Sequence, residues 1–140
     1  APLLPTLNNT FKVLEKFMYP LPQDTVLYHV KEETDHYAYC KSSWLPTSSS
    51  LHGIQYYIDH QMKGKVPDVI QRLVLKSTGI RGCRITTGEP QDDEEEVLVQ
   101  NRSALIFELI SDSETVEING QTVQLHTYEM SPTAQLCEMC

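Results

Sequence analysis

Apolar residues near the start of the chain recur with the spacing of one side of a helix. The stripe consists of Leu7, Phe11, Leu14 and Met18. Steps of three or four positions place these side chains on one face of an amphipathic helix. Pro20 ends this helix, because the residue before a proline is pushed out of the helical region. The pattern predicts a helix that packs its stripe against the core.

The segment 65–79, KVPDVIQRLVLKSTG, carries signals for a second helix at both ends. Pro67 suits the first turn, and Asp68 suits the positive end of the helix dipole. Lys76 suits the negative end, and Gly79 can adopt the left-handed terminating conformation. The apolar side of this helix would be formed by Val66, Val69, Ile70, Leu73 and Val74. We therefore predict that this segment is a packing helix.

Several other segments alternate between apolar and polar positions, as strands do. They include 80–88, 96–100 and SALIFELI at 103–110, and 115–130 is the clearest of them. Asn119–Gly120 lies between two such runs, and both central residues of a type I′ turn need positive φ. The pattern predicts a hairpin of strands 115–118 and 121–127, in which Ile118 pairs with Gln121. Its buried face would contain Val116, Ile118, Val123 and Leu125.

The segment 26–40 predicts another hairpin, and it contains the one arrangement that resembles a nucleophile beside a base. Its register would pair His29 with Ala38 and place Cys40 diagonal to His29. An imidazole beside a thiol favours the reactive thiolate. No orienting third group or oxyanion donor accompanies this pair, so a structural cysteine is the favoured interpretation.

The segment 52–60 fits both a strand and a helix. Alternation is seen at Ile54, Tyr56 and Ile58. On a helix, His52 and His60 would share a face with Asp59 nearby, which suggests a divalent metal site. Gly53 and the β-branched and aromatic content favour the strand, on which the two histidines are too far apart to bind one metal.

The segment 89–96, EPQDDEEE, ends in five consecutive acidic residues. They are Asp92, Asp93, Glu94, Glu95 and Glu96. Like charges repel one another and do not pack, so we expect a mobile, solvated loop. A calcium loop of the EF-hand type alternates its ligands and turns at a central glycine, and this run does neither. An acidic run can instead steer a partner protein with a basic surface.

These elements predict a single α+β domain over residues 1–140, in the order α-β-β-(β)-α-β-β-β-β, with a frayed tail at 131–140. Two main helices would pack on an antiparallel sheet. A strongly curved sheet would enclose a pocket lined by residues such as Tyr28, Tyr39 and Phe107, whereas a flatter sheet would act through its surface or edges.

Composition excludes some classes of partner. The chain has 140 residues, of which 40% are hydrophobic, and its formal net charge is -8. This size and content suit one soluble domain, and no apolar run is long enough to insert into a membrane. The negative charge repels phosphate backbones and anionic lipids, so we expect neither nucleic acid nor a membrane as a partner.

The cysteines and sequons bear on the cellular compartment. The four cysteines are Cys40, Cys83, Cys137 and Cys140. Cys137 and Cys140 have the spacing of half a zinc site, but no second half accompanies them. Sequons at Asn8 and Asn101 fit a secreted glycoprotein, whereas this cysteine usage favours an intracellular protein. The chain begins at Ala1, which fits either a mature product or a piece of a longer protein.

Three function classes follow. The favoured one is a non-enzymatic domain that binds another protein through a sheet edge or the apolar end of the N-terminal helix, with Asp92–Glu96 steering a basic partner. The first alternative is a carrier of a small apolar ligand in a curved-sheet pocket. The second is an enzyme that uses Cys40 with His29, or a carboxylate such as Asp59 or Glu108. We expect no cofactor and no bound metal.

Overall fold

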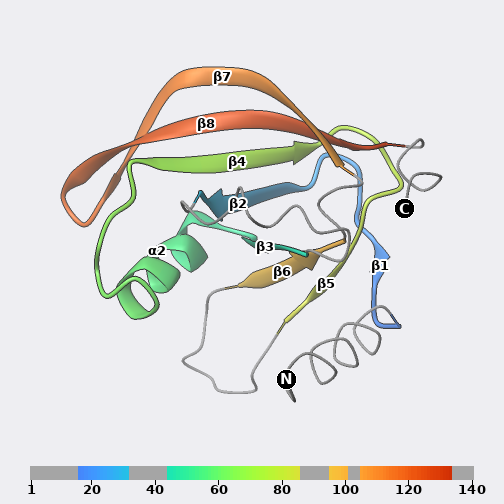
Figure 1. The fold of residues 1–140 in the computed structure, drawn as a ribbon, viewed down its shortest axis with the longest axis horizontal. Helices are drawn as coiled ribbons and strands as arrows, with labels where there is room; N and C mark the ends of the chain where they lie inside the picture. The colour runs from blue at the N-terminus through green and yellow to red at the C-terminus, as the bar shows by residue number, and fades with distance from the viewer. Residues whose placement is uncertain (1–15, 32–43, 86–94, 101–104, 134–140) are drawn as a thin grey trace, which may run out of the picture.

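The computed structural model describes residues 16–31, 44–85, 95–100 and 105–133. All of the strands in these segments belong to one sheet, with the order β1-β5-β6-β3-β2-β4-β8-β7. Their bounds, with that of the helix, are β1 (Tyr19–Pro20), β2 (Val26–Val30), β3 (Leu45–Ser48), α2 (Leu51–His60), β4 (Val69–Leu75), β5 (Arg81–Arg84), β6 (Glu96–Val99), β7 (Leu105–Ile118) and β8 (Gln121–Pro132). Figure 1 shows a twisted sheet in which the long β7–β8 hairpin lies on the opposite side from β1.

The sheet is mixed, so the predicted fold class is wrong. β4 and β8 run parallel, with Ile70 opposite Leu125, while the other neighbouring strands are antiparallel. In the described segments α2 is the one helix, in place of two main helices on an antiparallel sheet. α2, the helix of these segments, has neither the length nor the apolar content that spanning a bilayer requires.

The segment predicted as the second helix is strand β4, at the centre of the sheet between β2 and β8. Its side chains are buried on both faces: Ile70 on one, and Leu73 and Leu75 on the other. A strand covered on both faces has an almost continuous apolar run, which periodicity cannot distinguish from a helix. Gly79, with φ 101, marks a turn after the strand and does not end a helix.

The segment predicted as a strand is helix α2. Ser50 caps it, because its Oγ accepts a hydrogen bond from the Gly53 backbone N at 3.1 Å. The buried residues of this helix are Gly53, Ile54 and Ile58, and the two isoleucines lie one turn apart. The alternation of apolar residues is therefore incidental, and the serines before the helix are the signal that identifies it.

Two apolar clusters lie on opposite faces of the central strands. Register places Leu27 beside Leu73 on one face and Val30 beside Ile70 on the other. The first cluster contains Leu21, Leu27, Leu45, Leu73, Leu75, Ile80, Val97, Val99, Leu105 and Met130. The second contains Val30, Ile54, Ile58, Ile70, Ile118, Val123 and Leu125, and α2 contributes to it. Each face of β4 is thus covered by its own core.

The predicted 115–130 hairpin is confirmed, including its register. Asn119 and Gly120 form the turn with φ of 50° and 78°, and Ile118 lies opposite Gln121. Of the predicted buried face, Ile118, Val123 and Leu125 are buried and Val116 is half-buried. The Asn119 side chain also accepts a hydrogen bond from Gln55 at 3.1 Å and donates one to Asp59 at 2.8 Å. These bonds tie the tip of the hairpin to α2.

Replacing Gly120 with valine should lower the free energy of unfolding by at least about 1 kcal/mol, because a β-branched residue resists positive φ. No atom lies within 4 Å of a Cβ built at this position, so the cost is backbone strain and not a clash. Urea unfolding would measure the loss. Gly120→Asn is the control and should cost less, since asparagine tolerates the left-handed region. Equal losses in the two variants would argue against strain as the cause.

Other predictions fall partly or wholly outside the described residues. Leu7, Phe11 and Leu14 of the N-terminal helix lie outside them, and Met18 is buried between a turn and β1 and is not helical. Positions 36–40 of the first hairpin also lie outside, while its first strand is β2, which pairs with β3 and β4. Of the predicted frayed tail, Ser131 and Pro132 belong to β8 instead, and residues 134–140 lie outside the described residues.

Candidate functional site

β7 is one of the two edge strands of the sheet (Figure 1). Its first half exposes large apolar side chains. The exposed fractions are 50% for Ile106, 37% for Phe107, 48% for Leu109 and 53% for Ile110. A run of exposed apolar residues on an open strand edge is a frequent place for another strand to pair. This edge is the candidate functional site.

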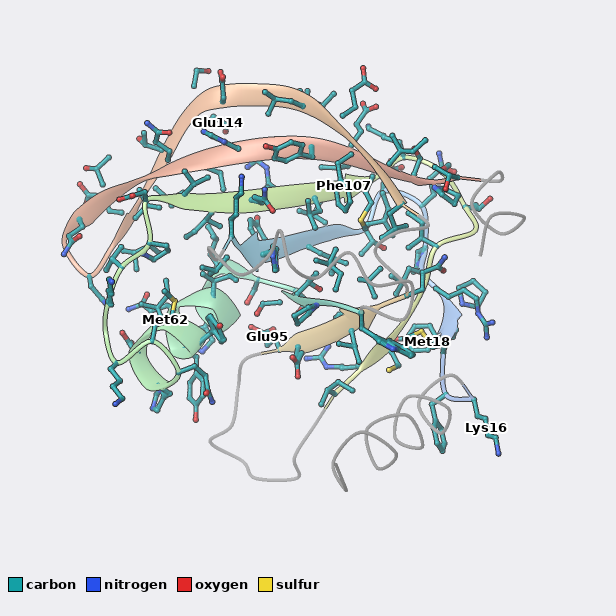
Figure 2. All side chains as sticks on the ribbon, in the orientation of Figure 1. Lys16, Met18, Met62, Glu95, Phe107 and Glu114 are labelled. Carbon is teal, nitrogen blue, oxygen red and sulfur yellow. The ribbon has the colours of Figure 1, made fainter. Side chains whose placement is uncertain are left out.

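Two irregularities divide β7 into halves. The register shifts once between Leu109 and Ser111 and again between Ser111 and Glu114, and each shift leaves one extra residue in β7. Such bulges bend a strand and interrupt its edge. Phe107 and Glu114 lie on either side of the bend, in the regular first half and on the arch (Figure 2). Only the segments 105–109 and 114–118 keep regular pairing with β8.

Arg72 connects the bulged part of β7, around Glu114, to the neighbouring strands. From β4 its guanidinium donates to Glu114 at 2.6 Å and to the Thr127 hydroxyl at 3.1 Å. The contact therefore links β4, β8 and β7 just beyond the second bulge. The apolar first half of β7, residues 105–109, takes no part in this contact.

Side chains of this first half alternate between the two faces. Phe107 lies opposite Met130 and Leu109 opposite Tyr128, on the face of the first cluster. Glu108 points to the other face, where it lies opposite Glu129. The edge thus offers Phe107 and Leu109 on one face, and Ile106 with two neighbouring carboxylates on the other.

The β7–β8 hairpin carries acids without lysine or arginine. Residues 105–132 contain the acids Glu108, Asp112, Glu114, Glu117 and Glu129 and neither basic type. Arg72, from outside the hairpin, pairs with Glu114. The open edge therefore has a negative field.

The predicted catalytic candidates do not form an active site among the described residues. His29 is buried in β2, and its Nδ1–H donates to the Pro46 carbonyl oxygen at 2.8 Å. Cys40 lies outside the described residues. The predicted hairpin register that placed it diagonal to His29 is wrong, because β2 pairs with β3 on one side and with β4 on the other, where His29 lies opposite Gln71. Asp59 and Glu108 are both exposed, contrary to the enclosed pocket that a catalytic carboxylate would need.

Cys83 is the cysteine that the structure describes. It is a buried free thiol, and burial raises its pKa, with a further contribution from the charge of Glu96. A buried thiol with a raised pKa remains protonated and is a poor nucleophile. Cys137 and Cys140, the half zinc site, lie outside the described residues, as do the sequons at Asn8 and Asn101.

The last two residues of the acidic run, Glu95 and Glu96, contact other elements and do not belong to a solvated loop. Glu96 belongs to β6 and pairs with Ser48. Glu95, labelled in Figure 2, accepts hydrogen bonds from the hydroxyls of Ser49 and Ser50. Its carboxylate lies at the N-terminus of α2, where the helix dipole favours negative charge. Asp92, Asp93 and Glu94 lie outside the described residues.

The metal and pocket hypotheses find no support in the described part of the chain. His52 and His60 lie on α2 but two turns apart, about 12 Å along the axis, and His60 stacks on Tyr56. No group of three His, Cys, Asp or Glu within the described ranges could hold a metal ion. Tyr28 and Phe107 lie on opposite faces of the sheet, so they do not line one pocket. Tyr39 lies outside these ranges.

Sequence reasoning identified SALIFELI, residues 103–110, as a strand but missed it as a site. Its one signal was the presence of apolar residues at successive positions, Leu105, Ile106 and Phe107, which a strand with a solvated face does not need. Comparison with known proteins adds no relative: no protein-family model matches the chain, and no curated protein matches it.

Proposed function

We propose that this domain is a non-enzymatic protein-interaction module that binds an extended segment of another protein as an additional strand along β7. The observation that carries the proposal is the exposure of Ile106, Phe107, Leu109 and Ile110 at the edge of the sheet. Strand addition uses main-chain hydrogen bonds for affinity and alternate side chains for specificity. The edge of β7 can supply the main-chain hydrogen bonds, and its exposed apolar side chains can supply the specificity.

The two halves of β7 differ in how well they resist such pairing. Bulges and charged side chains are common means by which proteins protect a strand edge. Here Asp112 lies within the second bulge, and Glu114 and Glu117 lie beyond both bulges. The stretch 105–109 has regular pairing with β8 and one charge, Glu108. We therefore assign the added strand to this stretch.

Steering by the acidic run belongs to the same proposal. Asp92–Glu96 would raise the association rate of a basic partner through long-range attraction, which salt screens within about 8 Å at physiological strength. Because Glu95 also contacts Ser50, a test of steering should substitute only Asp92, Asp93 and Glu94. This keeps the cap of α2 unchanged.

A short peptide in which valine and glutamine alternate is a suitable neutral probe. Its addition should slow backbone amide exchange in residues 105–109, because a paired strand protects these groups. Leu109→Lys should weaken binding by at least about tenfold, since it places a cation on the apolar side of the added strand. Hydrogen-exchange mass spectrometry and a binding titration would measure the two effects.

Thr115→Lys is the matched control. Thr115 is exposed on the same face of β7 beyond both bulges, and its substitution adds the same charge. It should leave peptide binding nearly unchanged. N-methylation of alternate peptide amides gives a second check: one set should abolish binding and the other should not, because only one set faces β7. Unchanged exchange at 105–109, or equal binding by both lysine variants, would refute the proposal.

A further inference from the structure

The edge of β7 holds two carboxylates directly opposite each other. Glu108 on β7 and Glu129 on β8 are register partners on the same face of the sheet. Like charges at directly opposite positions destabilise a sheet. Within the described segments neither carboxylate has a salt bridge to a lysine or arginine. The pair is therefore an uncompensated negative site at the open edge.

The neighbours of Glu108 along β7 point the other way. Phe107 and Leu109 lie on the face of the first cluster, and both are substantially exposed. A strand added along β7 would place one residue opposite Glu108, on the face of the two carboxylates. Its two flanking residues would lie beside Phe107 and Leu109, because side chains alternate along a strand. This constraint holds for parallel and antiparallel addition alike.

We propose, building on strand addition at β7, that the partner segment carries a lysine or arginine between two apolar residues. The cation lies directly opposite Glu108, with Glu129 one strand further into the sheet on the same face, and it offsets the charge of the pair. The apolar residues cover the exposed side chains of Phe107 and Leu109. The partner is thus an extended apolar–basic–apolar segment of another protein.

A second copy of this chain does not meet that requirement. The corresponding stretch of its β7 is Phe107-Glu108-Leu109, with an acid between the two apolar residues. Antiparallel pairing of two such edges would bring further carboxylates to a site that already holds two, and each chain has a net charge of -8. Charge therefore selects a basic partner over self-association.

Three peptides test this inference, in which valine alternates with lysine, with glutamine or with glutamate. At low salt the lysine peptide should bind at least about tenfold more tightly than the glutamine peptide, and the glutamate peptide should bind most weakly. The advantage of lysine should shrink as salt is added. Fluorescence anisotropy with labelled peptides would give the three affinities.

Substitution of the protein locates the effect. Glu108→Gln should reduce the preference for lysine over glutamine to within about threefold, because it removes one of the two facing charges. The matched control is Glu117→Gln, an exposed acid of the same strand beyond the bulges, which should retain most of the preference. Urea unfolding of both variants would verify that they fold.

The outcomes separate this inference from strand addition itself. Equal binding of the lysine and glutamine peptides, with exchange slowed at 105–109, would overturn the basic partner and keep strand addition. A preference for lysine that Glu108→Gln and Glu117→Gln lower equally would also overturn it, because the charge would then act at long range. Failure of all three peptides to protect 105–109 would overturn both proposals. Concentration-dependent dimerisation through β7 would overturn the argument against a second copy.

Discussion

Replacing Leu75 with alanine should lower the free energy of unfolding by about 2 to 5 kcal/mol, the usual cost of truncating a fully buried leucine. Leu75 lies in β4, has no exposed surface and belongs to the first cluster. Removal of its side chain loses apolar burial and leaves a cavity that neighbouring strands fill only in part. Urea unfolding followed by circular dichroism would measure the loss.

Val74→Ala is the control for this substitution, because the relative size of the two losses differs between a strand and a helix. Val74 is half-buried on the opposite face of β4, so Val74→Ala should cost about 1 kcal/mol. A helix over 65–79 would place Val74 on the apolar side and Leu75 outside it, which reverses the order of the two losses. A greater loss for Val74→Ala than for Leu75→Ala would thus contradict the central position of β4.

Replacing Ile58 with alanine should also lower the free energy of unfolding by about 2 to 5 kcal/mol. Ile58 is fully buried in the second cluster, where α2 covers the face of the sheet that carries Val30 and Ile70. The loss would measure how much this helix stabilises that face. Thermal or urea unfolding would report it as a single transition if the two clusters unfold together.

Gln55→Ala serves as the control on the same helix. Gln55 is exposed and donates one hydrogen bond to Asn119, so its replacement should cost less than about 1 kcal/mol. Similar losses for Ile58→Ala and Gln55→Ala would mean that α2 contributes little through its buried face. The hairpin tip would then be the main attachment of the helix.

The errors in sequence-based prediction involve segments whose conformation depends on distant neighbours. The apolar run of β4 fits a helix as well as a strand. Its conformation is decided by pairing with β2 and β8 at its two edges, which are distant in sequence. α2 has only ten residues, and too few turns for its periodicity to outweigh the alternation of Ile54, Tyr56 and Ile58. The cap at Ser50 was the local signal, since its hydroxyl bonds the Gly53 N–H and stabilises the first turn.

The 115–130 hairpin was predicted correctly because its cause is local. Asn119 and Gly120 adopt the positive φ values that a two-residue turn requires, and this turn sets the register of both strands. The interaction edge was not predictable in the same way. Whether a strand lies at an edge depends on which strands pair, and here β8 pairs with β4 in place of a third strand of its own hairpin.

The parallel pairing of β4 with β8 determines the order in which this protein can fold. Arg72 and Thr127, which meet across this pair, are 55 positions apart in the chain. During synthesis β4 can pair with β2 early. Its other edge can pair with β8 only after residues 124–130 have left the ribosome. The β7–β8 hairpin forms locally and then docks as a unit, which closes the centre of the sheet late. A nascent chain that ends before residue 124 therefore leaves one edge of β4 unpaired, and an unpaired strand edge can pair with another chain.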